Sequence, residues 1–64
     1  MIRKELEMIR FSQGLSKSEL CLRSGVSRST YGRFIKGEDV SLSTLERLFN
    51  VLGIVVKLDV VDGL

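Results

Sequence analysis

A run of small polar and basic residues lies near the middle of the chain. It comprises Ser27, Arg28, Ser29 and Thr30, and Arg33 follows about one helical turn later. The forked arginine side chain can bond the O6 and N7 atoms of guanine together, and a threonine methyl group can contact the methyl group of thymine. A short helix that carries such residues on its leading, exposed face is shaped to enter the major groove of DNA.

Each of these residues also has a more ordinary interpretation. Arg28 can read a base or clamp a phosphate, and Arg33 favours a phosphate somewhat more than a base. Ser29 and Thr30 can contact DNA or bond the local backbone at the start of a helix. Lys36 can contact the DNA backbone or complement the dipole at the end of the same helix.

The segment 15–37 predicts two short amphipathic helices joined by a tight turn. Ser16 and Glu19 have the spacing of a capping box, so they start the first helix, which ends near Arg23. The turn is Ser24-Gly25-Val26, in which glycine supplies conformational freedom. Ser27 caps the second helix through its hydroxyl group, and Gly37 ends it.

Two further helices are predicted to hold this pair in place. The first covers Ile2 to Ser12 and stops before Gly14; the last starts at a second capping box in the segment 43–46 and stops at Gly53. Their apolar residues recur at helical spacing, which predicts buried stripes. The predicted core is Ile2, Leu6, Ile9, Leu20, Cys21, Tyr31, Phe34, Leu45, Leu48, Val51 and Leu52.

The segment 54–61 changes period and predicts a β-strand. It is rich in β-branched residues, and Val56, Leu58 and Val60 alternate with charged residues. A lone strand leaves its backbone N–H and C=O groups unpaired, and the rest of the chain offers no second strand. The same strand of a second copy would pair with it in a two-stranded intermolecular sheet. We therefore expect a helical domain over residues 1–53 and a dimerising tail over residues 54–64.

Composition excludes several classes of function. With 64 residues, one cysteine and no histidine, the chain can form neither an internal disulfide nor a zinc site of the usual ligands. No apolar run approaches the roughly 20 residues that span a bilayer, so we expect a soluble, cytoplasmic protein without a membrane partner. No nucleophile–base pair or phosphate loop suggests an enzyme, and no cofactor is expected. Residues 1–36 carry a net charge of +5 and residues 37–64 carry −3, which indicates a basic face for a polyanion.

The sequence resembles the Cro/CI, or XRE-type, helix-turn-helix family from about Leu6 to Gly53. The resemblance is carried by core, turn and cap positions together: Gly14-Leu15-Ser16, Glu19-Leu20, Ser24-Gly25-Val26-Ser27, Arg33, Gly37, Ser41-Leu42-Ser43-Thr44-Leu45, Leu48 and Leu52-Gly53. It implies an all-α, four-helix, lambda-repressor-like domain that binds double-stranded DNA as a homodimer on a palindromic operator and represses transcription. By position, Lys17, Arg28, Ser29 and Arg33 match places that face base edges or nearby phosphates. Arg10, Ser27 and Lys36 match places that contact the DNA backbone.

Three positions depart from the family pattern. Lys17 stands where glutamine is common, which favours phosphate contact over base reading. Ile35 replaces a glutamate that often pairs with the arginine of the first helix, which would leave Arg10 free for DNA. Gly32 lies inside the DNA-facing helix at a cost of about 1 kcal/mol relative to alanine. Its presence favours either close approach of the backbone to DNA or to a neighbouring helix, or simple drift.

The biological setting stays open among three alternatives. The apolar tail is similar to the dimerising strand of HipB-like antitoxins, which implies a cognate toxin as a second partner. A phage or mobile-element regulator without a toxin fits the same residues, as does a protein-interaction module that no longer binds DNA. Met8, Phe11 and Leu22 fall outside the predicted stripes, and the first two can form an apolar patch for a second copy or another protein.

Overall fold

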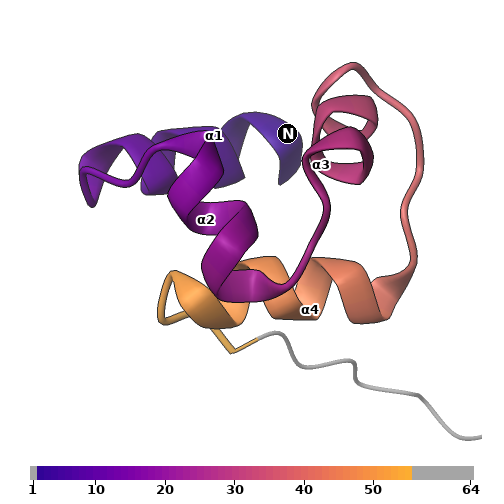
Figure 1. Cartoon of the computed structure of the whole chain (residues 1–64). Coiled ribbons are helices and arrows are strands. Elements are labelled where there is room, and N and C mark those ends of the chain that lie inside the picture. The colour runs from indigo at the N-terminus through magenta and orange to yellow at the C-terminus, as the bar shows by residue number, and fades with distance from the viewer. Residues whose placement is uncertain (1, 56–64) are drawn as a thin grey trace, which may run out of the picture.

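A computed structural model describes residues 2–55, which form four α-helices (Figure 1). Helix α1 covers Ile2–Ser12, α2 covers Lys17–Ser24, α3 covers Arg28–Ile35 and α4 covers Leu42–Val51. Helix α2 runs between α1 and α4 and packs against both α4 and α3. The predicted four-helix architecture is confirmed. Most of the predicted strand, with Val56, Leu58 and Val60, lies outside the described residues.

The turn between α2 and α3 follows the local sequence signals. The Ser16 hydroxyl accepts a hydrogen bond from the Glu19 N–H, and the Glu19 carboxylate accepts one from the Ser16 N–H, so the predicted capping box is present. Gly25 adopts a left-handed conformation with φ of +73°, which other residues rarely adopt. Val26 is buried directly after it, and Ser27 caps α3 by accepting from the Thr30 N–H.

Helix α4 begins two residues before the predicted position. The cap is Ser41, whose hydroxyl accepts from the Thr44 N–H at 3.2 Å, rather than Ser43. The predicted capping box with Glu46 is therefore wrong. Because Thr44 occupies the third position of the helix, Glu46 lies about half a turn too far along to reach back to the cap.

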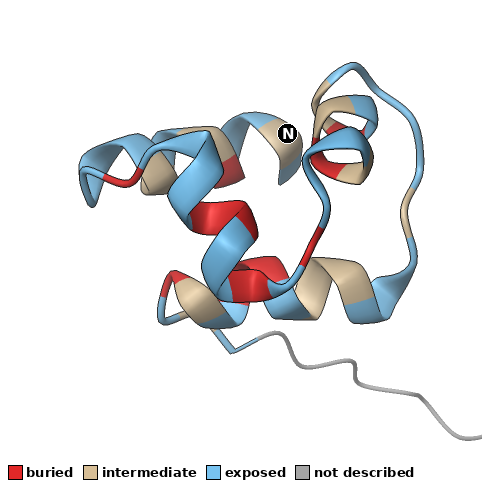
Figure 2. Ribbon diagram, in the orientation of Figure 1, coloured by how far each residue is buried: buried red, intermediate tan, exposed pale blue. Residues whose placement is uncertain are grey.

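The core lies where the four helices face one another (Figure 2). Four of its side chains, those of Leu6, Leu20, Tyr31 and Leu48, are almost completely buried, and Cys21, Phe34 and Leu52 also belong to it as predicted. Ile2 is an error of the prediction, because 42% of its surface is exposed at the start of α1. The buried stripe of α4 includes Phe49, which the prediction omitted, whereas Leu45 and Val51 are only half-buried at its edge.

One polar side chain of α1, that of Arg3, and one directly after α1, that of Gln13, also hold the helices together. The Arg3 guanidinium donates to the Phe34 carbonyl oxygen at 2.6 Å and to the Gly37 carbonyl oxygen at 2.9 Å, and it lies over the Phe34 ring. It thereby occupies the carboxyl end of α3, where a cation is favoured. The Gln13 side chain donates to the Leu52 carbonyl oxygen at 2.8 Å and so ties α1 to the end of α4.

No helix within residues 2–55 combines the length and the apolar character needed to cross a membrane.

Candidate nucleic-acid interface

Helix α3 has one buried face and one exposed face. Tyr31 and Phe34 lie in the core, whereas Arg28, Ser29, Arg33 and Lys36 are exposed. Three of these four exposed residues are cations. These four sequence-predicted contacts therefore lie on the side of α3 that the described residues leave accessible.

Two hydroxyl groups at the start of α3 are used within the protein. The Ser27 hydroxyl accepts from the Thr30 N–H at 3.1 Å and donates to the Thr30 hydroxyl at 2.9 Å. The Arg33 guanidinium lies 3.5 Å from the same Thr30 hydroxyl. These bonds favour the local interpretation of Thr30, which is also half-buried, whereas Ser29 is exposed and makes no such bond.

The start of α3, with Arg28, lies next to the start of α2, with Lys17. The Arg28 guanidinium donates to the hydroxyl of Ser18, in the first turn of α2. Lys17 precedes Ser18, and half of its side chain is exposed. Lys17, Arg28 and Lys36 border one hollow of about 180 Å³ between the two helices. The predicted DNA-contacting residues of α2 and α3 are thus close in space.

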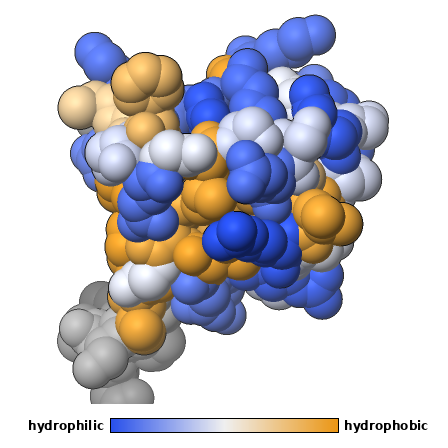
Figure 3. Space-filling view, turned by 60° about the vertical axis from the view of Figure 1, so that its left-hand side comes forward, coloured by the Kyte–Doolittle hydropathy of each residue, from blue (hydrophilic) through white to orange (hydrophobic). Residues whose placement is uncertain are grey.

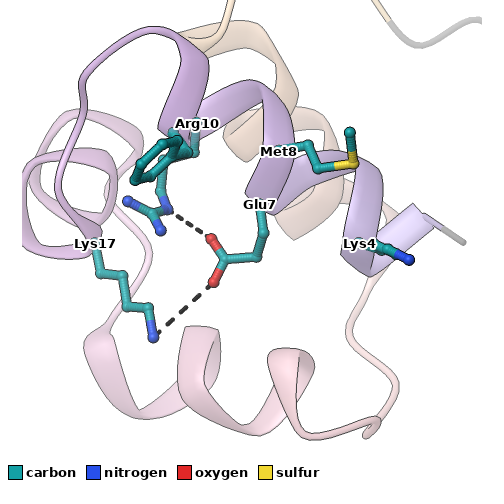
Figure 4. A pocket seen from close by; sticks show the side chains of 6 residues that line it. Lys4, Glu7, Met8, Arg10 and Lys17 are labelled. Carbon is teal, nitrogen blue, oxygen red and sulfur yellow. Dashed lines mark hydrogen bonds and ion pairs between the residues drawn. The ribbon is translucent and has the colours of Figure 1, made fainter.

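Arg10 is not free, contrary to the expectation from Ile35. Its Nε donates to the Glu7 carboxylate at 2.6 Å, its Nη1 donates to the Leu15 carbonyl oxygen at 2.5 Å, and its side chain is only 13% exposed (Figure 4). The family pattern places the acidic partner on the third helix. Here Glu7 stands three residues before Arg10 on α1 itself, a spacing at which helical side chains meet.

The same carboxylate connects three helices. Tyr31 of α3 donates its hydroxyl hydrogen to a Glu7 oxygen at 2.7 Å. The Lys17 ammonium of α2 lies 4.0 Å from the other Glu7 oxygen (Figure 4). The sequence places Tyr31 in the core, which is confirmed. Glu7 was not predicted, and the only signal for it was an acidic residue one turn before Arg10.

Comparison with known families agrees with this geometry. The helix-turn-helix family model matches residues 2–55, which include all four helices. The chain belongs to the Cro/CI, or XRE-type, helix-turn-helix family. It is accordingly a DNA-binding transcription regulator. The family is one of DNA-binding regulatory domains, which are not typically enzymatic. No curated protein and no solved structure matches the chain.

In this helix-turn-helix protein, α2 and α3 are the paired helices, and α3 is the second of them, the position that the recognition helix takes in such motifs. The hydrogen bond from the Tyr31 hydroxyl to the Glu7 carboxylate holds the buried side of α3 against α1. Burial alone would raise the pKa of the Glu7 carboxyl, but the hydrogen bonds from Arg10 and Tyr31 and the charges of Arg10 and Lys17 outweigh it and lower that pKa. Burial and the bond to Glu7 raise the pKa of the Tyr31 hydroxyl, so it stays a hydrogen-bond donor.

Cys21 of the helix-turn-helix protein is a core residue rather than a reactive thiol. It is buried on α2, and burial raises the pKa of its thiol above the ordinary value. A reactive cysteine needs the opposite shift, because the thiolate is the nucleophile.

Large apolar side chains also reach the surface of the helix-turn-helix protein. The exposed fractions are 62% for Met8, 80% for Phe11 and 84% for Leu22, which confirms that these residues lie outside the core. Met8 and Phe11 border a surface hollow of about 480 Å³ on α1. On the face drawn in Figure 3, apolar surface forms several patches among hydrophilic side chains.

Proposed function

We propose that this regulator is a sequence-specific repressor that binds a palindromic operator as a homodimer. The proposal rests on the two faces of α3. Tyr31 and Phe34 form its buried face, and Arg28, Ser29 and Arg33 are on its exposed face. A helix anchored on one side and cationic on the other can be held against paired bases in the major groove. The bound dimer would then block access to the DNA that it covers.

The exposed residues divide into those that read sequence and those that position the protein. Arg28, in the first turn of α3, is proposed to read a guanine, with Ser29 and Arg33 contacting bases or phosphates beside it. Lys17, Ser27 and Lys36 are proposed to contact phosphates, while Thr30 supports the helix start. Arg10 is left out of this set because Glu7 and the Leu15 carbonyl oxygen already engage its guanidinium.

Replacing Lys17 with alanine is expected to remove one phosphate contact. The slope of log K against log salt concentration should then fall by about one unit, with little change in base preference. Titrations of a duplex by fluorescence anisotropy at several salt concentrations would measure it. Arg47→Ala, which removes an exposed cation from α4, is the matched control and should keep the wild-type slope. A slope unchanged by Lys17→Ala would contradict the contact.

The dimer is proposed to form through the tail, by pairing of the segment 54–61 with its copy around a two-fold axis. Val56, Leu58 and Val60 would all lie on one face of such a strand, and this face would be covered in the dimer. Replacing Leu58 with aspartate is therefore expected to produce monomers, because two carboxylates would lie close together at the axis. Sedimentation equilibrium would measure the mass. Lys57→Gln, on the opposite face, is the comparison, because it adds no carboxylate opposite Asp59 of the copy and should stay dimeric. A Leu58→Asp protein that stays dimeric would contradict the model.

Selection of bound duplexes from a random DNA pool tests the proposed function as a whole. The expected result is enrichment of two inverted half-sites whose centres lie about one helical turn apart, near 34–36 Å. Enrichment of a single, unrepeated half-site would argue against a symmetric dimer. No enrichment at moderate ionic strength would contradict sequence-specific binding.

A second candidate, an antitoxin that also binds a toxin, is favoured by the exposed apolar side chains of Met8 and Phe11. These side chains lie on α1 beside Lys4 rather than on the exposed face of α3, so a protein partner could use a surface separate from the recognition helix. A neighbouring gene for a kinase-like toxin, and a defined complex between the two purified proteins, would support this setting. Without such a gene, a phage or mobile-element regulator is the remaining reading.

A further inference from the structure

The hollow between α2 and α3 has a glycine in its wall. We call it the Gly32 hollow; it measures about 180 Å³ and is lined by Lys17, Arg28, Tyr31, Gly32, Ile35 and Lys36. Its lining residues come from the start of α2 and from the length of α3. Such a volume has room for several water molecules and therefore for a group as small as a phosphate.

The fold itself does not require glycine at position 32. Gly32 lies inside α3 and lacks the positive φ found at Gly14, Gly25, Gly37 and Gly53. A Cβ atom built on Gly32 meets no atom of residues 2–55 within 4 Å. Close packing against a neighbouring helix, one of the explanations considered from the sequence, is therefore excluded. Since alanine would fit and would favour the helix, close approach of the α3 backbone to DNA and simple drift are the two explanations left for Gly32.

The charges around the hollow favour an anion. Lys17 and Lys36 border it from α2 and α3, and both are exposed. The Glu7 carboxylate lies 4.0 Å from the Lys17 ammonium, but it is already shared with Arg10 and Tyr31. Arg28 also borders the hollow, and its guanidinium donates to Ser18. Oxygen atoms of a phosphate accept strong hydrogen bonds from such cations.

We propose that the Gly32 hollow seats one phosphate group, with Lys17 and Lys36 as its cationic rim, and that the phosphate belongs to the DNA backbone. The missing Cβ lets the phosphate approach the α3 backbone closely, a use of glycine that recurs where a ligand meets the main chain. Gly32 is then a positioning residue, because it sets how deeply α3 lies in the groove. This inference rests on the proposed function and adds a residue to its DNA contacts.

Replacing Gly32 with alanine tests whether a DNA phosphate binds in the Gly32 hollow. The stability of the protein should rise, whereas its affinity for DNA should fall. The melting temperature should rise by about 4–8 °C, as expected for a more favourable helix residue in a domain of this size. The Kd for the selected duplex should rise about tenfold, and the slope of log K against log salt should fall by about one unit. A glycine with only a structural role would not couple higher stability to weaker binding.

Asn50→Ala is the matched control, since it adds helix propensity at an exposed position of α4. It should raise the melting temperature and leave the Kd unchanged. A Gly32→Ala protein that binds the duplex as tightly as wild type would overturn the phosphate site in the Gly32 hollow. The proposed function would still be supported if the wild-type protein prefers the selected duplex over other duplexes. A wild-type protein that discriminates among no duplexes would instead overturn the proposed function.

Inorganic phosphate separates the two sources of the group. Amide chemical shifts of the wild-type protein would be followed during a phosphate titration at constant ionic strength. We expect no saturable shift of the Gly32 amide. Free phosphate lacks the many other contacts by which a duplex would hold its phosphate in the hollow. Saturable shifts at Gly32, together with an unchanged duplex affinity of Gly32→Ala, would assign the hollow to free phosphate and overturn the DNA assignment.

Discussion

Replacing Arg28 with alanine is expected to weaken binding to the selected duplex by about 1–3 kcal/mol, roughly 5- to 150-fold in Kd. Arg28 is exposed in the first turn of α3, and its one described partner is the Ser18 hydroxyl, which DNA can replace. A guanidinium that bonds both O6 and N7 of guanine distinguishes that base from the other three. The loss should therefore fall mainly on one base pair of each half-site.

The measurement compares the Kd values of duplexes that carry each of the four base pairs at every position of the half-site. Arg28→Ala should flatten the preference at one position and keep the others. Arg47→Ala is the charge-matched control, because Arg47 is an exposed arginine of α4 and does not belong to α2 or α3. It should lower affinity evenly, if at all. Base preferences of Arg28→Ala equal to those of wild type would contradict base reading by Arg28.

Replacing Glu7 with glutamine is expected to destabilise the fold by about 1–3 kcal/mol at pH 7. Glu7 accepts hydrogen bonds from Arg10 at 2.6 Å and from Tyr31 at 2.7 Å, and three-quarters of its side-chain surface is covered. Glutamine removes the charge, and the Arg10 guanidinium would keep only a neutral partner in a largely buried place. Urea unfolding would measure the loss. Glu5→Gln, at an exposed position of the same helix, should change stability little.

The effect of Glu7 should depend on pH in a defined direction. Because the folded protein lowers the pKa of this carboxyl below its ordinary value of 4.5, the folded state favours the ionised form. The stabilisation is present above the ordinary pKa and is lost as the pH falls through the lower folded value. The stability gap between wild type and Glu7→Gln should therefore narrow during acidification from pH 7 to below pH 4. A gap that stays constant over this range would contradict the network.

The parts of the fold that local sequence signals determine were predicted correctly. The capping box at Ser16, the left-handed Gly25 and the cap at Ser27 depend on neighbours within a few residues, so the turn before α3 followed from spacing alone. The start of α4 shows the limit of this approach. Three candidates for the cap, Ser41, Ser43 and Thr44, occur in the segment 41–44, and their types and spacing alone do not decide which of them caps the helix.

The parts that depend on distant residues could not be predicted in this way. Tyr31 and Glu7 are 24 residues apart, and Arg3 bonds a carbonyl group 31 residues away at Phe34. Neither spacing carries a periodic signal. The family pattern also misled at Arg10, since it directs attention to position 35, where Ile35 stands, and the acidic partner comes from α1 instead. In this chain, the hydrogen bonds from Tyr31 to Glu7 and from Arg3 to the Phe34 carbonyl oxygen connect α1 to α3 instead.

The central claim is that the exposed face of α3 lies against DNA, and amide chemical shifts of the labelled protein on titration with the selected duplex test it most directly. We expect the largest shifts at moderate salt within residues 27–36 and at Lys17, and small shifts at Met8 and in the second half of α4. Largest shifts along the Met8 side of α1, with α3 unaffected, would contradict it.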